Sequence, residues 1–302
     1  MNTKAPGKIV ISGAYAVLEG ARAVVAAVDR YVFADSEREA SFVTPEVDAA
    51  LGAGERAPWF DASALREGGQ KLGLGSSAAI VVASLGALAL DKRPSLDDAA
   101  LAAEVFPKAL SAHRSAQGGG SGIDVAASTY GGILVAQRSL DTLRLSQVAL
   151  PPGVVVRVLA AAHPASTPEL IRQVHGLRAR DATLYETLMA RQAEASERAA
   201  AAMVSGDAQA FLAALREQAA ALTALGSAAS AAIVTEEVAR LAAAAERLGA
   251  AALPAGAGGG DIALWVSVGP VDPPADDALR EVPLRLGSAG LSRAPGLDLG
   301  RA

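Results

Sequence analysis

A glycine- and serine-rich turn is the segment of this sequence best suited to chemistry. Two glycines and two hydroxyl residues stand directly before a long apolar run, in the order Gly73, Gly75, Ser76, Ser77 and Ala78. Backbone N–H groups at the start of a helix bind anions, and glycines let a phosphate approach the chain closely. The hydroxyls can also ligate Mg²⁺. A tight turn with a serine cap would need neither two glycines nor two serines, so the pattern favours phosphate binding.

Three better-known motifs fit the same residues less well. The dinucleotide fingerprint Gly-x-Gly-x-x-Ala requires a buried strand before it, and the polar run Arg66–Lys71 is no such strand. A Walker A loop requires Gly-Lys-Ser or Gly-Lys-Thr, which the chain lacks. A hydrolase elbow requires Gly-x-Ser-x-Gly, but Ala79 and Ile123 stand where its last glycine belongs. The sequence therefore favours a nucleotide-binding turn of another kind.

Three further segments carry residues that could act on a bound phosphate. Lys8 follows Ala5-Pro6-Gly7 at the start of the first predicted strand, although a solvated lysine is the commoner case. Asp124 stands among small residues after a glycine run, where the helix dipole alone also favours an acid. The segment Pro254–Asp261 has more glycines than a plain hairpin would use. Taken singly, each segment is compatible with a purely structural role.

Composition limits the metals and partners that such a site could use. The chain has 302 residues and no cysteine, and its histidines are too scattered for a histidine metal site: His113, His163 and His175. Any metal would be a hard ion bound by oxygen. A net charge of −5 gives no general attraction to nucleic acid or to an anionic membrane. The N-terminus lacks the features of a signal peptide, so we expect a cytoplasmic protein with neither partner.

Short strands and alanine-rich helices must position these residues. Strands are predicted at 8–18 (two extended pieces joined by a turn at 12–13), 23–32, 41–43, 59–65, 133–137, 154–162, around 254–260 and at 282–286. Helices are predicted at 76–90, 95–112, 121–129, 168–205 in one or two pieces, 208–224 and 236–248. Pro151-Pro152-Gly153 marks a boundary between two lobes. The tail 271–302 is irregular and predicts a degraded final element.

The four segments, in this order, resemble the GHMP kinases, the family of galactokinase, homoserine kinase, mevalonate kinase and phosphomevalonate kinase. APGKIVISGAYAVLEG, KLGLGSSAA and ALPAGAGGGD are similar to its three motifs, and the resemblance extends to about Gly269. It implies an α+β, two-lobed GHMP kinase fold with ATP and substrate in the cleft between the lobes. A ribosomal-S5-domain-2-like N-terminal domain would cover 1–150, and a ferredoxin-like C-terminal domain would cover 151–302.

Details within the motifs resemble the phosphomevalonate kinase branch of that family. They are AYAVLEG, AHRSAQGGGSGIDVAASTYGG, ASTPELI and GGGD. This resemblance implies ATP-dependent phosphorylation of a small anionic acceptor, phosphomevalonate, with Mg²⁺, by a monomer or homodimer. Another kinase of the family, such as mevalonate kinase, and a catalytically weakened nucleotide-binding homologue stay open as alternatives.

The resemblance also implies a role for individual residues. Gly73, Gly75, Ser76, Ser77 and Ala78 would hold the ATP phosphates, and Ser77 would also ligate Mg²⁺. Lys8 and Asp124 would flank the acceptor. Because a phosphate monoester is largely dianionic at neutral pH, Asp124 would orient Lys8 and the acceptor more than abstract a proton. Residues implied to bind the acceptor are His113, Arg114, Ser121, Ser166, Thr167, Gly256, Gly258 and Asp261.

Three positions depart from the family pattern. Ala14 stands where an acid usually precedes Tyr15, and Leu253-Pro254-Ala255 stands where phosphomevalonate kinases tend to have Lys-Pro-Ser. His113 aligns with a glutamate that helps to hold Mg²⁺ in mevalonate kinases. These departures lie on the acceptor side of the expected site, so ATP binding is predicted more strongly than the identity of the acceptor.

Overall fold

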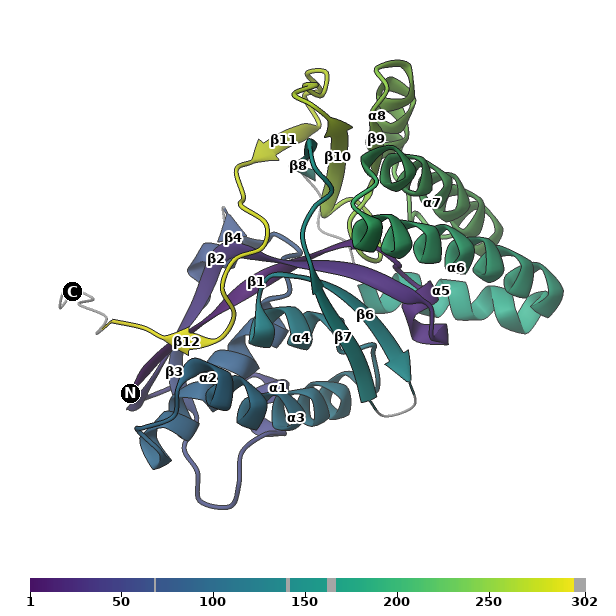
Figure 1. Cartoon of the computed structure of the whole chain (residues 1–302). Helices are drawn as coiled ribbons and strands as arrows, with labels where there is room; N and C mark the ends of the chain where they lie inside the picture. The colour runs from purple at the N-terminus through teal and green to yellow at the C-terminus, as the bar shows by residue number, and fades with distance from the viewer. Residues whose placement is uncertain (68, 140–141, 162–166, 296–302) are drawn as a thin grey trace. The chain divides into compact units, whose positions relative to one another are not determined.

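The computed structural model describes residues 1–67, 69–139, 142–161 and 167–295, which form a mixed α+β chain (Figure 1). They fall into two compact units, both discontinuous in sequence. Unit 1 comprises Met1–Ile9, Ala26–Gly132 and Arg285–Ala302, and unit 2 comprises Val10–Val25 and Ile133–Leu284. Strands β1 (Asn2–Ser12) and β2 (Arg22–Glu39) therefore each contribute to both units. The division into functional domains at 1–150 and 151–302 stays a prediction.

The sheet of unit 1 is built around the long strands β1 and β2. Strand β3 (Pro58–Asp61) pairs antiparallel with β2, and β12 (Ser292–Arg293) pairs antiparallel with β1. A small hairpin, β4 (Arg66–Glu67) with β5 (Gln70–Lys71), precedes the glycine turn. Among the described strands of this unit, the order is β12-β1-β2, with β3 paired to β2. The predicted strand at 23–32 is confirmed, but β2 extends seven residues further at its C-terminal end.

The helices of unit 1 carry most of its chemistry-bearing residues. They are α1 (Pro45–Asp48), α2 (Ser76–Lys92), α3 (Asp98–Gln117) and α4 (Ile123–Tyr130). Helix α2 is buried along most of its length because its residues are alanine, valine and leucine on every side. In Figure 1, α2, α3 and α4 lie together on one side of β1 and β2. The predicted helices at 76–90 and 121–129 are thus confirmed.

Unit 2 contains an antiparallel sheet and four described helices. Its strands β8 (Val154–Ala161), β9 (Ala251–Pro254), β10 (Ile262–Val268) and β11 (Leu279–Val282) lie in the order β11-β8-β10-β9. The helices are α5 (Thr167–Arg180), α6 (Ala182–Ser205), α7 (Ala208–Ala229) and α8 (Glu236–Arg247). The fully buried Trp265 and Phe211 anchor the core, and the Trp265 indole donates to the Val271 carbonyl at 2.7 Å.

Several predicted elements are wrong in detail, each for a local reason. The second extended piece of 8–18 is a 3₁₀ turn over Ala16–Glu19, closed by Gly20 in the left-handed region. Residues 41–43 are irregular, and helix α3 starts later than predicted because Asp97, not Ser95, caps it: the Asp97 carboxylate accepts from Ala100 N–H. Strands β6 (Ile133–Ser139) and β7 (Thr142–Val148) pair as a hairpin whose second strand was not predicted.

The prediction that the tail is a degraded element is wrong. Beyond β11 the chain returns to unit 1, where β12 pairs with β1 and the Leu291 side chain is 3% exposed. Leu291 packs over Gly86 of α2, where an added Cβ would lie 2.7 Å from Leu291 Cδ1. Gly131 and Gly290 approach backbone to backbone: a Cβ on Gly131 would lie 2.2 Å from the Gly290 nitrogen. Residues 285–295 of the tail therefore form an integral edge of unit 1.

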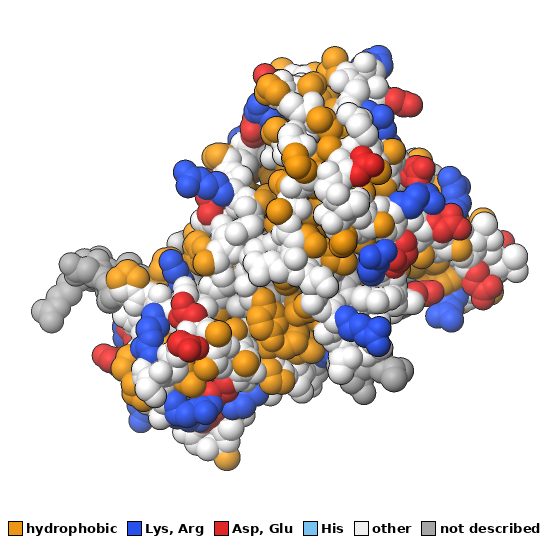
Figure 2. Space-filling model, in the orientation of Figure 1, with side chains coloured by type: hydrophobic (Ala, Val, Ile, Leu, Met, Phe, Trp, Pro, Cys, Tyr) orange, Lys and Arg blue, Asp and Glu red, His pale blue; other side chains and the backbone are white. Residues whose placement is uncertain are grey.

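The visible surface mixes both signs of charge. Figure 2 shows acidic and basic side chains interspersed over the face in view, and ion pairs such as Arg157 with Glu281, at 3.2 Å, link neighbouring elements. Within the described part of the chain, no helix has the length and apolar character needed to cross a bilayer. The cytoplasmic location and the absence of a nucleic-acid partner stay predictions.

Candidate functional site

The predicted phosphate-binding turn lies at the start of the buried helix α2. Gly73 and Gly75 have φ of 69° and 74°, a left-handed conformation that favours glycine. Gly75 immediately precedes the helix, Ser76 and Ser77 form its half-buried first residues, and Ala78 is buried. The first N–H groups of a helix have no partner within it and lie at the positive end of its dipole. The turn therefore has the local structure of an anion-binding site.

The structure brings Lys8 of β1 to this turn. The Lys8 backbone N–H donates to the Leu74 carbonyl at 2.8 Å, and Lys8 Nζ donates to the Gly73 carbonyl at 3.4 Å. A Cβ on Gly75 would lie 2.7 Å from Lys8 Cε, so the lysine stem fills the space that a larger residue would occupy. A cation and the start of a helix thus face one small volume, which favours binding of an anion there.

A hydrogen-bonded group joins three of the predicted residues across three helices. His113 Nε2 lies 3.3 Å from Ser77 Oγ and 3.4 Å from Asp124 Oδ2, and the His113 side chain is 3% exposed. Asp124 stands in the first turn of α4, where its Oδ1 accepts from the Val125 N–H at 2.9 Å. The histidine therefore connects the hydroxyl of the glycine turn with the predicted acceptor-side carboxylate.

Two residues of this group were missed by the sequence analysis. Gln117 Nε2 donates to Ser77 Oγ and to Glu46 Oε1, both at 3.2 Å, and Glu46 of α1 is 8% exposed. Gln117 stands four residues after His113, so helical spacing could have placed both on one face of α3. Nothing in the sequence near Glu46 pointed to this contact, because α1 is a single turn between irregular segments.

Arg114 and Ser121 lie together in the loop that joins α3 to α4. Arg114 Nη2 donates to the Ser121 carbonyl at 3.3 Å, and Ser121 Oγ accepts from the Ile123 N–H at 3.5 Å. The connecting glycines, 118–120, all have positive φ. These contacts order the loop that leads into Asp124. Their predicted role in binding the acceptor stays a prediction.

The other glycine-rich segment forms a tightly held loop in unit 2, between β9 and β10. Gly256 N–H donates to the Val10 carbonyl at 3.3 Å. Gly258 has φ of 82°, and a Cβ there would lie 2.1 Å from the Ile233 carbonyl oxygen, so only glycine fits. Asp261 closes the loop, and its carbonyl accepts from the Ala161 N–H. The predicted acceptor-binding role of Gly256, Gly258 and Asp261 stays a prediction.

Tyr15 holds this loop from a strained backbone conformation. Its φ and ψ are 62° and −53°, and the Ala16 N–H donates to the Ala14 carbonyl at 2.7 Å, which defines a γ-turn of the rare positive-φ kind. The Tyr15 hydroxyl donates to the Ala257 carbonyl at 2.7 Å. Burial raises the pKa of the Tyr15 phenol, so it remains a protonated donor at neutral pH.

Replacing Tyr15 with phenylalanine should loosen the loop without opening a cavity. The change removes one partly buried hydrogen bond, so we expect a loss of about 1 kcal/mol in the free energy of unfolding. Amide hydrogen exchange across 255–260 should accelerate as well. Tyr31→Phe is the matched control, because the Tyr31 hydroxyl makes only an exposed 3.4 Å contact with the Ala289 carbonyl. Equal exchange rates in the two variants would contradict this role for Tyr15.

The remaining positions are two departures from the family pattern, Ala14 and Leu253, and two predicted acceptor contacts, Ser166 and Thr167. Ala14 is buried against Tyr15 in the apolar core, and Leu253 is 1% exposed in β9, opposite Leu264. The residues that stand in place of the expected charges therefore serve packing. Thr167 is the first residue of α5. Ser166 lies outside the described residues.

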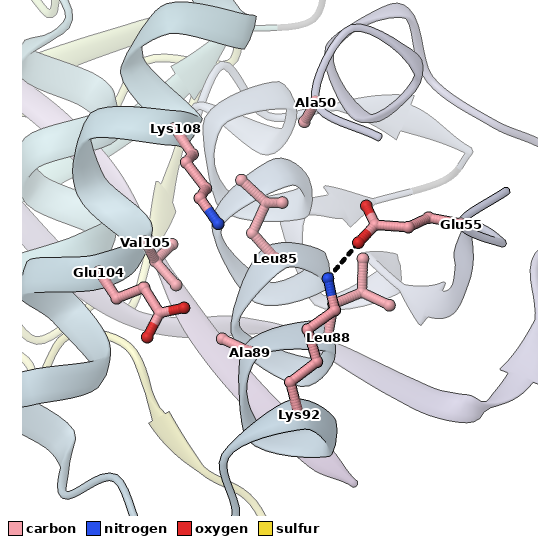
Figure 3. A pocket seen from close by; sticks show the side chains of 9 residues that line it. All are labelled: Ala50, Glu55, Leu85, Leu88, Ala89, Lys92, Glu104, Val105 and Lys108. Carbon is pink, nitrogen blue, oxygen red and sulfur yellow. Dashed lines mark hydrogen bonds and ion pairs between the residues drawn. The ribbon is translucent and has the colours of Figure 1, made fainter. Parts of the chain in front are cut away.

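A shallow pocket lies elsewhere in unit 1, beside the last turns of α2 (Figure 3). In Figure 3, Lys92 points toward Glu55, with which it forms an ion pair. The contact with Lys92 is the largest cause that lowers the pKa of Glu55, and the hydrogen bond from the Gly52 N–H is the second. The α2 residues that line it begin at Leu85, about 13 Å along the helix from Ser76. None of the predicted site residues lines this pocket.

The residues at the turn fit Mg²⁺ carried by a nucleotide better than a metal ion held by the protein alone. Among the described residues, no cluster of three or more histidine, cysteine, aspartate or glutamate side chains is placed to hold a metal. Ser77 Oγ lies in the turn, and the Asp124 carboxylate is joined to it through His113 Nε2. Mg²⁺ commonly keeps phosphate and water ligands and takes only one or two from a protein.

Known proteins resemble this chain in sequence and in fold. Residues 62–132 match the family model for the GHMP kinases N terminal domain. The sequence is 27% identical to a phosphomevalonate kinase from Streptomyces sp. (strain CL190), over 85% of this chain and 87% of that protein. The Lin0012 protein from Listeria innocua superposes with a TM-score of 0.81 at 24% identity, over 97% of this chain and 99% of that one.

A third relative was solved with ligands. The Streptococcus pneumoniae phosphomevalonate kinase, in complex with phosphomevalonate and AMPPNP, superposes with a TM-score of 0.71 at 21% identity, over 89% of this chain and 93% of that one. Together with the sheets and helices of the two units, these similarities confirm the predicted α+β GHMP fold.

Proposed function

We propose that this chain, which carries a GHMP kinase N-terminal domain within the fold of that family, transfers the γ-phosphoryl group of ATP to phosphomevalonate. The observation that carries the proposal is the approach of Lys8 to the glycine turn. The ammonium lies beside the Gly73 carbonyl, at the start of α2, where phosphates would meet both a cation and helix N–H groups. Phosphoryl transfer requires mainly such positioning and charge neutralisation.

The reaction would need little covalent chemistry from the protein. An oxygen of the acceptor phosphate forms a bond to the γ-phosphorus as the bond from that phosphorus to the β,γ-bridging oxygen breaks, and ADP leaves with the electron pair. The turn 73–78 would hold the ATP phosphates, and Lys8 would neutralise charge on the transferring group. Mg²⁺, when bound with ATP, would supply further positive charge to neutralise the phosphates during transfer.

Asp124 would orient the acceptor side and need not act as a base. A phosphate monoester has its second pKa near 6 and is already largely dianionic at neutral pH. One carboxylate oxygen of Asp124 accepts from the Val125 N–H, and the other lies 3.4 Å from His113 Nε2. This arrangement suits a carboxylate that is held in one position.

Phosphomevalonate is favoured over other acceptors by two independent likenesses. The Streptomyces relative is named a phosphomevalonate kinase, and the S. pneumoniae neighbour was solved with phosphomevalonate bound. A catalytically weakened nucleotide-binding homologue is the second candidate. It is motivated by Ala14 and Leu253, which lie in the apolar core, and by the half-buried Ala255, because all three stand where charged or polar groups are expected.

An acceptor panel tests the proposal directly. ADP release would be followed with Mg·ATP and each of phosphomevalonate, mevalonate, homoserine and galactose, with AMPPNP affinity measured in parallel. We expect kcat/KM to be at least about 100-fold higher for phosphomevalonate than for mevalonate, because a site built for a second anion leaves its cations unpaired without it. Faster turnover of mevalonate would replace the proposed acceptor. AMPPNP binding without turnover of any acceptor would favour the weakened homologue.

A further inference from the structure

We infer that His113 is a positioning residue, which holds the Ser77 hydroxyl and the Asp124 carboxylate in fixed relation through a single ring nitrogen. The inference rests on the proposed function and assigns a role to a residue that the sequence analysis placed among acceptor contacts. His113 would act through its two neighbours and would touch neither ATP nor the acceptor.

Burial separates His113 from any bound ligand. The side chain is 3% exposed, and Nε2, the nitrogen turned toward the site residues, is already shared between Ser77 Oγ and Asp124 Oδ2. The other nitrogen, Nδ1, is buried and has no hydrogen-bond partner among the described residues. A cation for the acceptor would need an accessible N–H, and His113 offers none.

The chemistry of the partners determines which nitrogen carries the hydrogen. An ionised carboxylate only accepts hydrogen bonds, so His113 Nε2 must be the donor toward Asp124. Nδ1 faces no acceptor that would require a hydrogen there. Ser77 Oγ therefore receives one N–H from His113 and another from Gln117 Nε2, at 3.3 and 3.2 Å. With both lone pairs engaged, the Ser77 hydroxyl hydrogen is left to donate to a phosphate oxygen, and one of these two donors would have to move away before Ser77 Oγ could ligate Mg²⁺ as predicted.

This geometry links the residues proposed to hold ATP with the residues proposed to face the acceptor. Ser77 lies in the first turn of the helix that would hold the ATP phosphates, and Asp124 lies in the first turn of the helix that would face the acceptor. Because one Nε2–H holds both oxygens, a shift of the ring displaces both groups together. Phosphoryl transfer is sensitive to such misplacement, since an error of about 1 Å can lower the rate about 100-fold.

Two polar substitutions of His113 separate positioning from packing. In His113→Gln the amide nitrogen reaches the position of Nε2, whereas in His113→Asn it reaches only the position of Nδ1. We expect His113→Asn to lower kcat for phosphomevalonate about 100-fold, while the KM values for ATP and for phosphomevalonate stay within about 3-fold of those of the natural chain. His113→Gln should keep kcat within about 5-fold of the natural chain. His175→Asn, at an exposed position on α5, is the control and should change neither constant.

A second measurement does not depend on turnover. The Kd for Mg·AMPPNP, measured by calorimetry, should rise about 10-fold in His113→Asn and recover in His113→Gln, because the Ser77 hydroxyl loses its orientation only in the former. If the natural chain turns over no acceptor, the proposed function fails, while this Kd comparison still tests His113. The inference would be overturned if both His113 variants lost the same kcat and nucleotide affinity. It would also be overturned if these losses only paralleled a lower midpoint of thermal unfolding.

Discussion

Replacing Lys8 with methionine will lower kcat about 1000-fold while changing the Kd for Mg·AMPPNP less than about 10-fold. Removing one preorganised charge from a transferring group typically costs 100- to 1000-fold in rate. Methionine keeps the stem that packs against Gly75, where an added Cβ would meet Lys8 carbons, so the turn itself should persist. Steady-state kinetics and calorimetry on the same preparation would measure both effects.

Lys4→Met is the matched control for this experiment. Lys4 lies on the same strand, with its ammonium over the Tyr31 ring at 4.8 Å, and has no contact with the glycine turn among the described interactions. Its replacement should leave kcat within about 2-fold of the natural chain, since exposed charge contacts of this kind contribute little to stability. A comparable loss in both variants would mean that general charge, not the position of Lys8, matters.

Asp124→Asn should lower kcat less than Lys8→Met does. Asparagine retains the shape of the side chain, and the proposed acceptor needs no base. The amide would still lie beside His113 and the Val125 N–H, although it accepts more weakly than a carboxylate. A larger loss for the aspartate change would show that Asp124 takes part in proton transfer, which would point to a hydroxyl acceptor.

Replacing Leu291 with alanine will lower the free energy of unfolding by about 3 kcal/mol, although Leu291 is near the end of the described chain. The side chain is 3% exposed and packs over Gly86, so truncation leaves a cavity against α2. The β12 pairing with β1 adjoins it through Ser292 and Arg293. Urea unfolding, followed by circular dichroism, would give the free energy.

Leu248→Ala provides the comparison for this prediction. Leu248 is 51% exposed at the end of α8, so its truncation should change stability by less than about 0.5 kcal/mol. If Leu291→Ala were as mild as this control, the tail would not be an integral part of unit 1. A tail of little structural value would then accord with the original interpretation of residues 271–302.

The local structure of the site can be predicted from the amino-acid sequence. A continuous alanine and leucine run predicts a buried helix, and α2 was placed to within two residues at each end. Glycines at Gly73, Gly75 and Gly258 report backbone conformations that other residues rarely adopt, and all three have positive φ. These features can be predicted from the sequence because they depend only on residues within a few positions.

Only the tertiary structure decided which distant groups share one site. Lys8 reaches the turn across 65 residues, and His113 meets Ser77 across 36, through a buried contact that turns a predicted acceptor ligand into a positioning residue. Glu46 and the tail gave no sequence signal, because a one-turn helix and a two-residue strand have too little periodicity to detect. Their places depend on packing against β1, α2 and α3, which no local pattern encodes.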